Sequence, residues 1–373
     1  MSLDKEIDKA QKLVRTDSLQ MSIGELATMY EAEELIINPE FQRLFRWELE
    51  QKARLIESLL LGIPVPSIFV FEKGDGTWEL IDGLQRLSSI FEFMGILRNP
   101  DTGKVSTPSA LIATKYLHSL NNAVWQKDKR IPDPTVELQV ELDKKYQLSI
   151  RRSRLNVQIL KRPSDSQTKF ELFQRLNAGG TQANPQELRN SIVIMMKPEF
   201  NVMMRELSKD VNFTAIIELN DEAKEKQRDM EYVSRFLTYT YVPYDGTLDI
   251  EEYVDDGLMK IIGNKNRAKI EEDFGNTFDL LMKACGKDAL RRYDGTRFTG
   301  RIGYTAFELI AIGIAKNLKE ILARPNPVKY VNTRVKAIWA EGIPESLVYG
   351  GMRGTTRIAR TLPAGSQWFK VDA

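Results

Sequence analysis

The spacing of apolar residues changes near residue 190, and this change limits the folds that the chain can adopt. Before that point, short apolar runs such as 67–71 and 77–81 are bounded by glycine, proline and aspartate, which is typical of strands. Beyond it, apolar residues recur every three or four positions, for example over 274–285, which is typical of helices. We therefore expect an α+β fold, with a small mixed sheet and helices over residues 1–190 and a mainly α-helical domain over 191–373.

Local signals define the individual elements expected in the first part. Ser22 and Glu25 have the spacing of a capping box and predict the start of a short helix. Apolar positions over 49–61 predict a one-sided helix that ends at Gly62. The turn at 73–76 predicts a hairpin between the two flanking strands. We also expect a helix at the amino terminus, strands at 34–37, 136–142 and 154–160, an irregular insertion at 99–135, and helices that begin at 163 and 184.

The chain of 373 residues has one cysteine, Cys285, and one histidine, His118, and these counts exclude several classes of site. One cysteine cannot form an internal disulfide, and the two residues are too few for a Cys/His zinc module. An HExxH motif and a conventional HNH nuclease centre each need more than one histidine, so both are excluded. We interpret His118 as a packed or surface residue, because no carboxylate lies near it in the sequence. The acidic run 218–231 contains lysines and is interpreted as a solvated helix face, so no metal site is expected.

The distribution of charge is uneven although the net charge is only +1. Residues 286–373 carry a net charge of +8 and residues 1–285 a net charge of −7. A basic end on an acidic body predicts either contact with a polyanion or attraction between the two parts or to a partner subunit. Arg353, Arg357 and Arg360 would share one face if their segment is helical, and we predict that they contact the DNA backbone.

The amino terminus is charged where a signal peptide needs an apolar core. The sequence also lacks any run of about 18 apolar residues. We therefore expect a cytoplasmic protein without membrane contact.

The segment Asp82-Gly-Leu-Gln-Arg86 lies at an expected junction from strand to helix. Helix amino termini present unpaired N–H groups and bind anions. In this interpretation Asp82 caps the helix, Gly83 permits close approach, and Gln85 and Arg86 point away from the apolar stripe toward a phosphate. The alternative is an ordinary capping box between Asp82 and Gln85, with Arg86 as a solvated charge.

Two further segments have residue types that suit a nucleotide. The segment 38–47 interleaves arginine with aromatic residues, which could hold phosphate and stack a base, or could simply cover the sheet. The segment 173–181 contains paired glycines, whose backbone N–H groups could approach a ligand, although a helix end followed by a turn explains them equally well. The five tryptophans are assigned to packing.

The order of these motifs resembles one family. The series is Phe41-Gln-Arg43 with Trp47, then Glu57-Ser-Leu-Leu-Leu-Gly-Ile-Pro-Val-Pro66, then Asp82–Arg86, then Phe173 to Thr181, and finally Arg228-Asp229. It is similar, over about residues 20–240, to the domain at the amino terminus of GmrSD-type type IV restriction proteins and related phage-defence proteins. The resemblance implies a ParB/sulfiredoxin-like fold that binds or hydrolyses a nucleotide.

The resemblance also implies roles for particular residues. Asp82, Gln85 and Arg86 would be catalytic, with a nucleoside triphosphate, GTP or ATP, and Mg²⁺ as the expected ligands. The nucleotide or phosphate would be bound by Gln42, Arg43, Gly83, Asn177, Gly179 and Gly180. The chain departs from the family at Leu84, where the family has glutamine, and it lacks the usual HNH nuclease domain. A separate nuclease subunit is therefore an expected partner. No Walker motif is present, so any hydrolysis belongs to another class than the P-loop enzymes.

Two other functions remain open at the level of sequence. The same arginine-rich cleft could receive DNA phosphate in a DNA-binding or nuclease module, supported by the basic end of the chain. Alternatively, the chain is a non-catalytic sensor or regulatory subunit, as the change at Leu84 and the absent nuclease domain would indicate.

Overall fold

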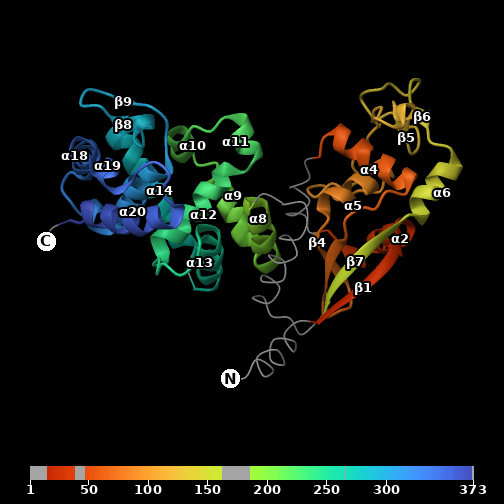
Figure 1. Ribbon diagram of the computed structural model, residues 1–373, viewed down its shortest axis with the longest axis horizontal. Coiled ribbons are helices and arrows are strands. Elements are labelled where there is room, and N and C mark those ends of the chain that lie inside the picture. Colours follow the sequence, from red (N-terminus) through yellow and green to blue (C-terminus); the bar gives the residue numbers. More distant parts are fainter. Residues whose placement is uncertain (1–14, 38–46, 162–184, 265, 372–373) are drawn as a thin grey trace. The chain divides into compact units, whose positions relative to one another are not determined.

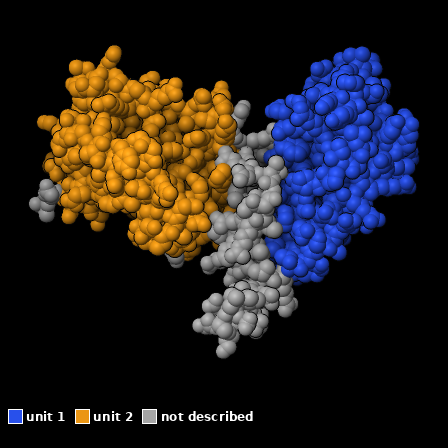
Figure 2. All heavy atoms as spheres, in the orientation of Figure 1, with its two compact units in different colours: residues 1–182 blue, residues 183–373 orange. Residues whose placement is uncertain are grey.

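The computed structural model describes residues 15–37, 47–161, 185–264 and 266–371 (Figure 1). The chain divides into two compact units, Met1–Gln182 and Ala183–Ala373 (Figure 2). The first unit contains a mixed sheet with helices and the second is mainly helical, so the predicted α+β class is confirmed. The expected boundary at 190 falls inside helix α8 (Pro185–Met196), which the structure assigns to the second unit.

Five strands form the sheet of unit 1, in the order β1-β7-β3-β4-β2. The strands are β1 (Arg15–Ser22), β2 (Leu35–Ile36), β3 (Ile68–Glu72), β4 (Trp78–Asp82) and β7 (Arg154–Lys161). The predicted hairpin is confirmed, because β3 and β4 pair antiparallel. The pairs β3–β7 and β2–β4 are parallel, and β1–β7 is antiparallel, so the sheet is mixed.

The amino-terminal strand β1 was not predicted. We expected a helix at the start of the chain; residues 1–14 lie outside the described residues, and residues 15–22 form a strand. Every residue of β1 pairs with β7, from Arg15 opposite Lys161 to Ser22 opposite Arg154. The segment itself carries little strand periodicity, so the pairing with a distant strand determines its structure.

Two helices of unit 1 begin or end at the residues that the local signals predict. Helix α2 (Ile23–Glu31) begins with the expected capping box: the Ser22 N–H donates to the Glu25 carboxylate at 2.7 Å and the Glu25 N–H donates to the Ser22 hydroxyl at 3.2 Å. Helix α4 (Leu49–Leu61) ends at Gly62, whose φ of 70° is left-handed. Helix α5 (Leu84–Phe93) follows β4. Of the expected strand at 136–142 only β6 (Val140–Glu141) forms, paired with β5 (Ala123–Val124), and an unpredicted helix α6 (Lys144–Arg152) follows it.

The insertion at 99–135 is attached to α4 through one buried carboxylate. Glu57, only 6% exposed, accepts hydrogen bonds from the Thr114 hydroxyl and from the backbone N–H groups of Tyr116 (2.9 Å) and Leu117 (3.1 Å). The hydrogen bond from Thr114 holds the pKa of Glu57 below its ordinary value. Burial acts in the opposite direction, and the two backbone N–H groups lower the pKa further. His118 follows in a short 3₁₀ turn and is exposed, as predicted.

We expect Glu57→Ala to loosen the insertion without unfolding unit 1. The amides of Tyr116 and Leu117 lose their acceptor, so their hydrogen exchange should accelerate about tenfold or more. The pKa of Glu57 is lower in the folded chain than its ordinary value of 4.5. The Glu57 carboxylate therefore stabilises the folded chain above pH 4.5, and this stabilisation is lost as the pH falls through the pKa of the folded state. The control is Glu50→Ala on the same helix, whose carboxylate is exposed. Equal exchange in the two variants would contradict the anchoring role.

Unit 2 is built from helices around an aromatic core. Its longer helices are α8, α9 (Pro198–Leu207), α12 (Arg228–Tyr241), α13 (Ile250–Asn264), α14 (Arg267–Cys285), α18 (Pro327–Ala340) and α20 (Gly354–Trp368). Shorter elements are α10 (Val211–Ile217), α11 (Asp221–Glu225), α15 (Tyr304–Ala306), the π-helical η3 (Phe307–Ala311), α16 (Ile312–Lys316), α17 (Leu318–Leu322), α19 (Ile343–Leu347) and the hairpin β8 (Arg292–Tyr293) and β9 (Phe298–Thr299). Phe213, Phe236, Phe274 and Phe278 pack together with ring centroids 4.7–5.7 Å apart.

Helix α20 belongs to this core. An added Cβ at Gly313 of α16 would lie 2.6 Å from the Gly365 carbonyl oxygen, and one at Gly365 would lie 2.4 Å from that of Leu309. The backbones of these helices therefore touch. Within the described part of the chain, no helix combines the length and apolarity that crossing a bilayer requires.

Candidate functional site

The junction between β4 and α5 holds Arg86 in a fixed position. One Arg86 guanidinium nitrogen, Nη2, donates to the Asp82 carboxylate at 3.1 Å and to the Ser67 carbonyl at 3.0 Å. The Arg86 side chain is only 14% exposed and that of Asp82 37%. The Nε–H of Arg86 is also buried and has no hydrogen-bond partner among the described residues. The site therefore contains a desolvated guanidinium with one donor unused.

Gly83 determines the shape of this junction. It is the N-cap residue of α5 and has a φ of 99°, in the left-handed region. A Cβ at this position would lie 2.5 Å from Cγ2 of Ile68, which is fully buried. Both the backbone conformation and the close packing thus require glycine. The opposing strand is irregular here too, since its register shifts between Phe69 and Val70, next to the pairing of Phe69 with Asp82.

The prediction that Asp82 caps α5 is wrong. Asp82 is the last residue of β4, the N-cap is Gly83, and no side chain caps the helix. The alternative capping box is also wrong, because the N-cap is Gly83 and the side-chain amide oxygen of Gln85, Oε1, accepts the Trp47 backbone N–H at 3.2 Å. Arg86 is paired and largely buried rather than solvated. Gln85 thereby joins the start of α5 to the start of α4.

A cavity of about 300 Å³ opens beside Arg86. Its lining consists of Trp47, Gln51, Arg54, Leu55, Ser58, Pro64, Val65, Pro66 and Arg86. Most of these residues come from α4 and from the proline-rich turn after it. That turn is the end of the family motif Glu57–Pro66. The cavity places two guanidinium groups and one indole ring around the same space.

Sequence reasoning missed one of these residues and left another open. Arg54 was not singled out, and Trp47 was included in the segment 38–47 that could stack a base but was assigned to packing by default. A signal was present, because Gln51, Arg54 and Ser58 have the spacing of one helical face, separate from the buried face of α4. Arg54 also pairs with Glu50 at 2.7 Å, but both of these side chains are well exposed, so the Arg54 head is free to turn toward a ligand.

The structure does not place the remaining predicted residues at this cavity. Gln42, Arg43, Asn177, Gly179 and Gly180 lie outside the described residues. Their part in the site stays a prediction.

The three arginines predicted to contact DNA differ in their surroundings. Arg353 precedes α20 and is exposed, and Arg360 is exposed with one bond to the Leu347 carbonyl at 3.3 Å. Arg357 instead pairs at 2.9 Å with the fully buried carboxylate of Glu308, which also accepts from Thr361 at 2.7 Å. The charge of Arg357 is therefore neutralised inside unit 2, and the three do not form a row of equivalent exposed cations.

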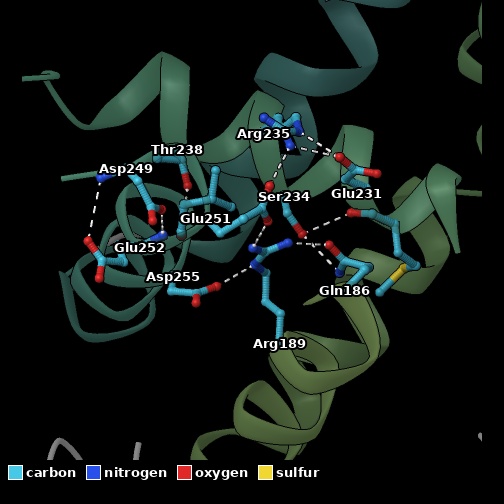
Figure 3. Close-up of polar contacts among 12 residues, drawn as sticks. Gln186, Arg189, Glu231, Ser234, Arg235, Thr238, Asp249, Glu251, Glu252 and Asp255 are labelled. Carbon is cyan, nitrogen blue, oxygen red and sulfur yellow. Dashed lines mark hydrogen bonds and ion pairs between the residues drawn. The ribbon is translucent and has the colours of Figure 1, made fainter. Parts of the chain in front are cut away.

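A buried charge network in unit 2 was not predicted at all (Figure 3). Arg189 of α8, 2% exposed, contacts Asp255 at 2.6 Å, Glu251 at 2.8 Å and Gln186 at 2.6 Å. Glu251 also contacts Arg235 of α12 at 2.9 Å. Burial alone would raise the pKa of Glu251, but the two guanidinium groups hold it below its ordinary value.

This network connects three helices, α8, α12 and α13. Its guanidinium and carboxylate groups pair with one another, so we assign it a structural role. The partners are 66 and 62 residues apart in the sequence, which no local pattern could reveal. Among the described residues, no cluster of histidine, cysteine, aspartate or glutamate has the arrangement of a metal site.

Unit 2 also contains a larger cavity, of about 490 Å³, between the 243–246 loop and α20. Ile358, Leu362 and the half-buried Lys316 line it, and burial lowers the pKa of that lysine. None of the motif residues lies there, so size alone does not identify the site.

The fold and the junction at Asp82–Arg86 define unit 1 as an α+β domain with a cavity beside the point where a strand turns into a helix. Residues 23–194 match the family described as "GmrSD restriction endonuclease, N-terminal domain". The predicted resemblance is confirmed over this segment, which is similar to the amino-terminal domain of GmrSD-type restriction proteins. The matched residues run from the start of α2 into α8. No curated protein matches the chain.

Proposed function

We propose that unit 1 binds a nucleoside triphosphate at the cavity beside Arg86 and hydrolyses it, as a component of a type IV restriction system. The observation that carries the proposal is the buried Nε–H of Arg86, which lacks a partner among the described residues at the edge of a cavity. A buried guanidinium donor without an acceptor costs free energy, and a phosphate oxygen would supply that acceptor. The cavity volume of about 300 Å³ is at the small end of ligand sites, which suits a nucleotide that is partly exposed.

Each wall of the cavity has a part in this proposal. Trp47 offers a face on which a base stacks, and Arg54 supplies a second positive charge for the phosphates. The amino terminus of α5 adds the positive end of a helix dipole. Asp82 orients Arg86 through their 3.1 Å ion pair, and its partly exposed carboxylate is the group that would hold Mg²⁺ through water.

In hydrolysis, Arg86 stabilises the negative charge that develops on the transferred phosphoryl group. Leu84, where the family has glutamine, is 7% exposed and lies in the core. Its side chain therefore takes no part in lining the cavity, so the departure at this position leaves the proposed machinery intact.

Nucleotide hydrolysis by the full chain tests the proposal. We expect Arg86→Ala to reduce the hydrolysis of ATP or GTP about 100- to 1,000-fold, because a charge-stabilising donor is lost. Arg86→Lys should restore little, since lysine lacks the planar fork. The matched control is Arg301→Ala, an exposed arginine of unit 2. Circular dichroism would verify the fold of each variant.

Two results would overturn the proposal. One is hydrolysis that Arg86→Ala leaves unchanged. The other is failure of ATP and GTP, at millimolar concentration with Mg²⁺, to bind in calorimetry. The second result would favour a non-catalytic sensor subunit.

DNA is the second proposed ligand, and the restriction-endonuclease name of the matched family favours it. In this proposal a separate subunit supplies the nuclease centre, since a chain with one histidine has no conventional HNH site. Arg353 and Arg360 are the exposed members of the predicted DNA contact.

A further inference from the structure

The densest positive charge of the chain lies on α6 and the start of β7. Residues 144–154 read KKYQLSIRRSR, with five cations and no carboxylate. The cations are Lys144, Lys145, Arg151, Arg152 and Arg154, and all five are exposed. The chain as a whole has almost equal numbers of basic and acidic residues, 53 and 52. Such a concentration of one sign is therefore a local property of this helix.

The helical geometry directs four of these cations to the same side. At about 100° per residue, Lys144, Lys145, Arg151 and Arg152 fall within an arc of roughly 120°. Ile150, the buried residue of α6, points to the opposite side. The two pairs are seven residues apart, which separates them by about 10 Å along the helix axis. Leu148, 39% exposed, lies between the two pairs, so the outward face of α6 is a short positive stripe around one apolar side chain.

These charges are scarcely neutralised by the protein itself. Lys144, Arg151 and Arg152 have no ion pair within the described ranges, and Lys145 has one long contact, 3.8 Å, to the neighbouring Asp143. By contrast, Lys52 of unit 1 is held by the Glu92 carboxylate at 2.9 Å. Unpaired surface cations are the groups that gain most from replacing the counterions of a polyanion.

Helix α6 is also fixed in place before any ligand binds. The Gln147 side-chain amide donates to the carbonyls of Trp125 (2.7 Å) and Leu142 (2.9 Å). At the other end the Ser153 carbonyl accepts the Ile23 N–H at 2.9 Å, and the Ser153 hydroxyl donates to the Leu59 carbonyl at 3.3 Å. Figure 1 shows α6 at the edge of unit 1, beside α2. A rigid and peripheral helix offers its charges without an ordering cost.

We propose that the outward face of α6, continued by Arg154, is a docking surface for the phosphate backbone of duplex DNA. A membrane surface fits less well, because Leu148, 39% exposed, is the one aliphatic side chain among these cations, and a single such side chain offers little apolar area for insertion into lipid. A single strand fits less well too, because the only aromatic residue of the helix, Tyr146, lies outside the charged arc with its ring under Lys145 at 4.6 Å. Contacts of this kind fix position on DNA and carry no base specificity.

Binding of the full chain to a fluorescent duplex of about 30 base pairs tests the proposal. The test variant carries Lys144→Gln, Lys145→Gln, Arg151→Gln and Arg152→Gln. We expect its affinity at about 0.15 M salt to fall about 100-fold or more, and the slope of log affinity against log salt to fall by about 3 to 4. These side chains are exposed, so the variant should fold like the parent chain.

The matched control has the same net charge but a dispersed set of substitutions. It carries Lys209→Gln, Lys287→Gln, Lys319→Gln and Lys329→Gln, all exposed and in unit 2. A second comparison is Arg353→Gln with Arg360→Gln, which addresses the basic end of the chain. The proposal requires a larger loss in the α6 variant than in either comparison. An equal loss in the dispersed control, a larger loss at Arg353 and Arg360, or no binding of the parent chain to the duplex would overturn it.

Discussion

Replacing Arg189 with methionine is expected to lower the free energy of unfolding of unit 2 by about 3–5 kcal/mol. The substitution leaves Asp255, 6% exposed, without the guanidinium that contacts it at 2.6 Å. It also removes the hydrogen bond to Gln186, whereas Glu251 keeps Arg235 as a partner at 2.9 Å. A buried carboxylate that loses the guanidinium beside it costs more free energy than the removal of both members of the pair.

Denaturant unfolding, followed by fluorescence of the full chain, measures this effect. The informative second variant combines Arg189→Met with Asp255→Leu, which removes both charges. Its stability should recover by about 1–3 kcal/mol relative to Arg189→Met alone, because the buried carboxylate that lost its guanidinium is removed as well. If the double variant were the less stable of the two, the explanation by an unpaired charge would be wrong.

Gly83→Ala is expected to destabilise unit 1 by about 2–4 kcal/mol and to abolish nucleotide binding. Two costs combine: the left-handed backbone at φ 99°, and a Cβ placed 2.5 Å from Cγ2 of Ile68. The second cost is the larger, because Ile68 is fully buried and cannot move aside without disturbing β3.

The protein supplies a control that separates these two costs. Gly76, in the turn between β3 and β4, also has a positive φ, 86°, but a Cβ there would meet nothing within 4 Å. Gly76→Ala should therefore cost only the backbone share, about 1 kcal/mol. Chemical denaturation of both variants measures the difference. Equal destabilisation would show that steric contact with Ile68 contributes nothing.

The elements that could be predicted are those with local signals. Helix α2 has its capping box, α4 has Gly62 at its end, and the β3–β4 hairpin has glycine and aspartate in its turn. Strand β1 could not be predicted, because its structure depends on pairing with a strand more than a hundred residues away. Helix α6 was missed for another reason: only Ile150 is buried, so it has no apolar stripe.

The candidate site also combines residues that a local sequence motif indicates with residues that only tertiary packing brings together. The motif Asp82–Arg86 gives the junction its residues, so Arg86 could be chosen from the sequence. The orientation of Asp82 toward Arg86, and not toward the helix terminus, follows from the left-handed Gly83. Trp47 and Arg54 join the site only because α4 packs beside the turn at Pro64–Pro66. Such proximity results from tertiary packing, which no local sequence pattern predicts.

The backbone contact between α16 and α20 restricts how the basic end of the chain can be studied. Ile358 and Phe369 are fully buried, and Gly365 is in contact with the Leu309 carbonyl. A truncation that removes residues 350–373 would therefore remove part of the hydrophobic core of unit 2. Loss of DNA affinity in such a shortened protein would report unfolding as readily as a missing contact. Point substitutions at Arg353 and Arg360 leave that part of the core in place. They therefore distinguish the loss of a DNA contact from unfolding.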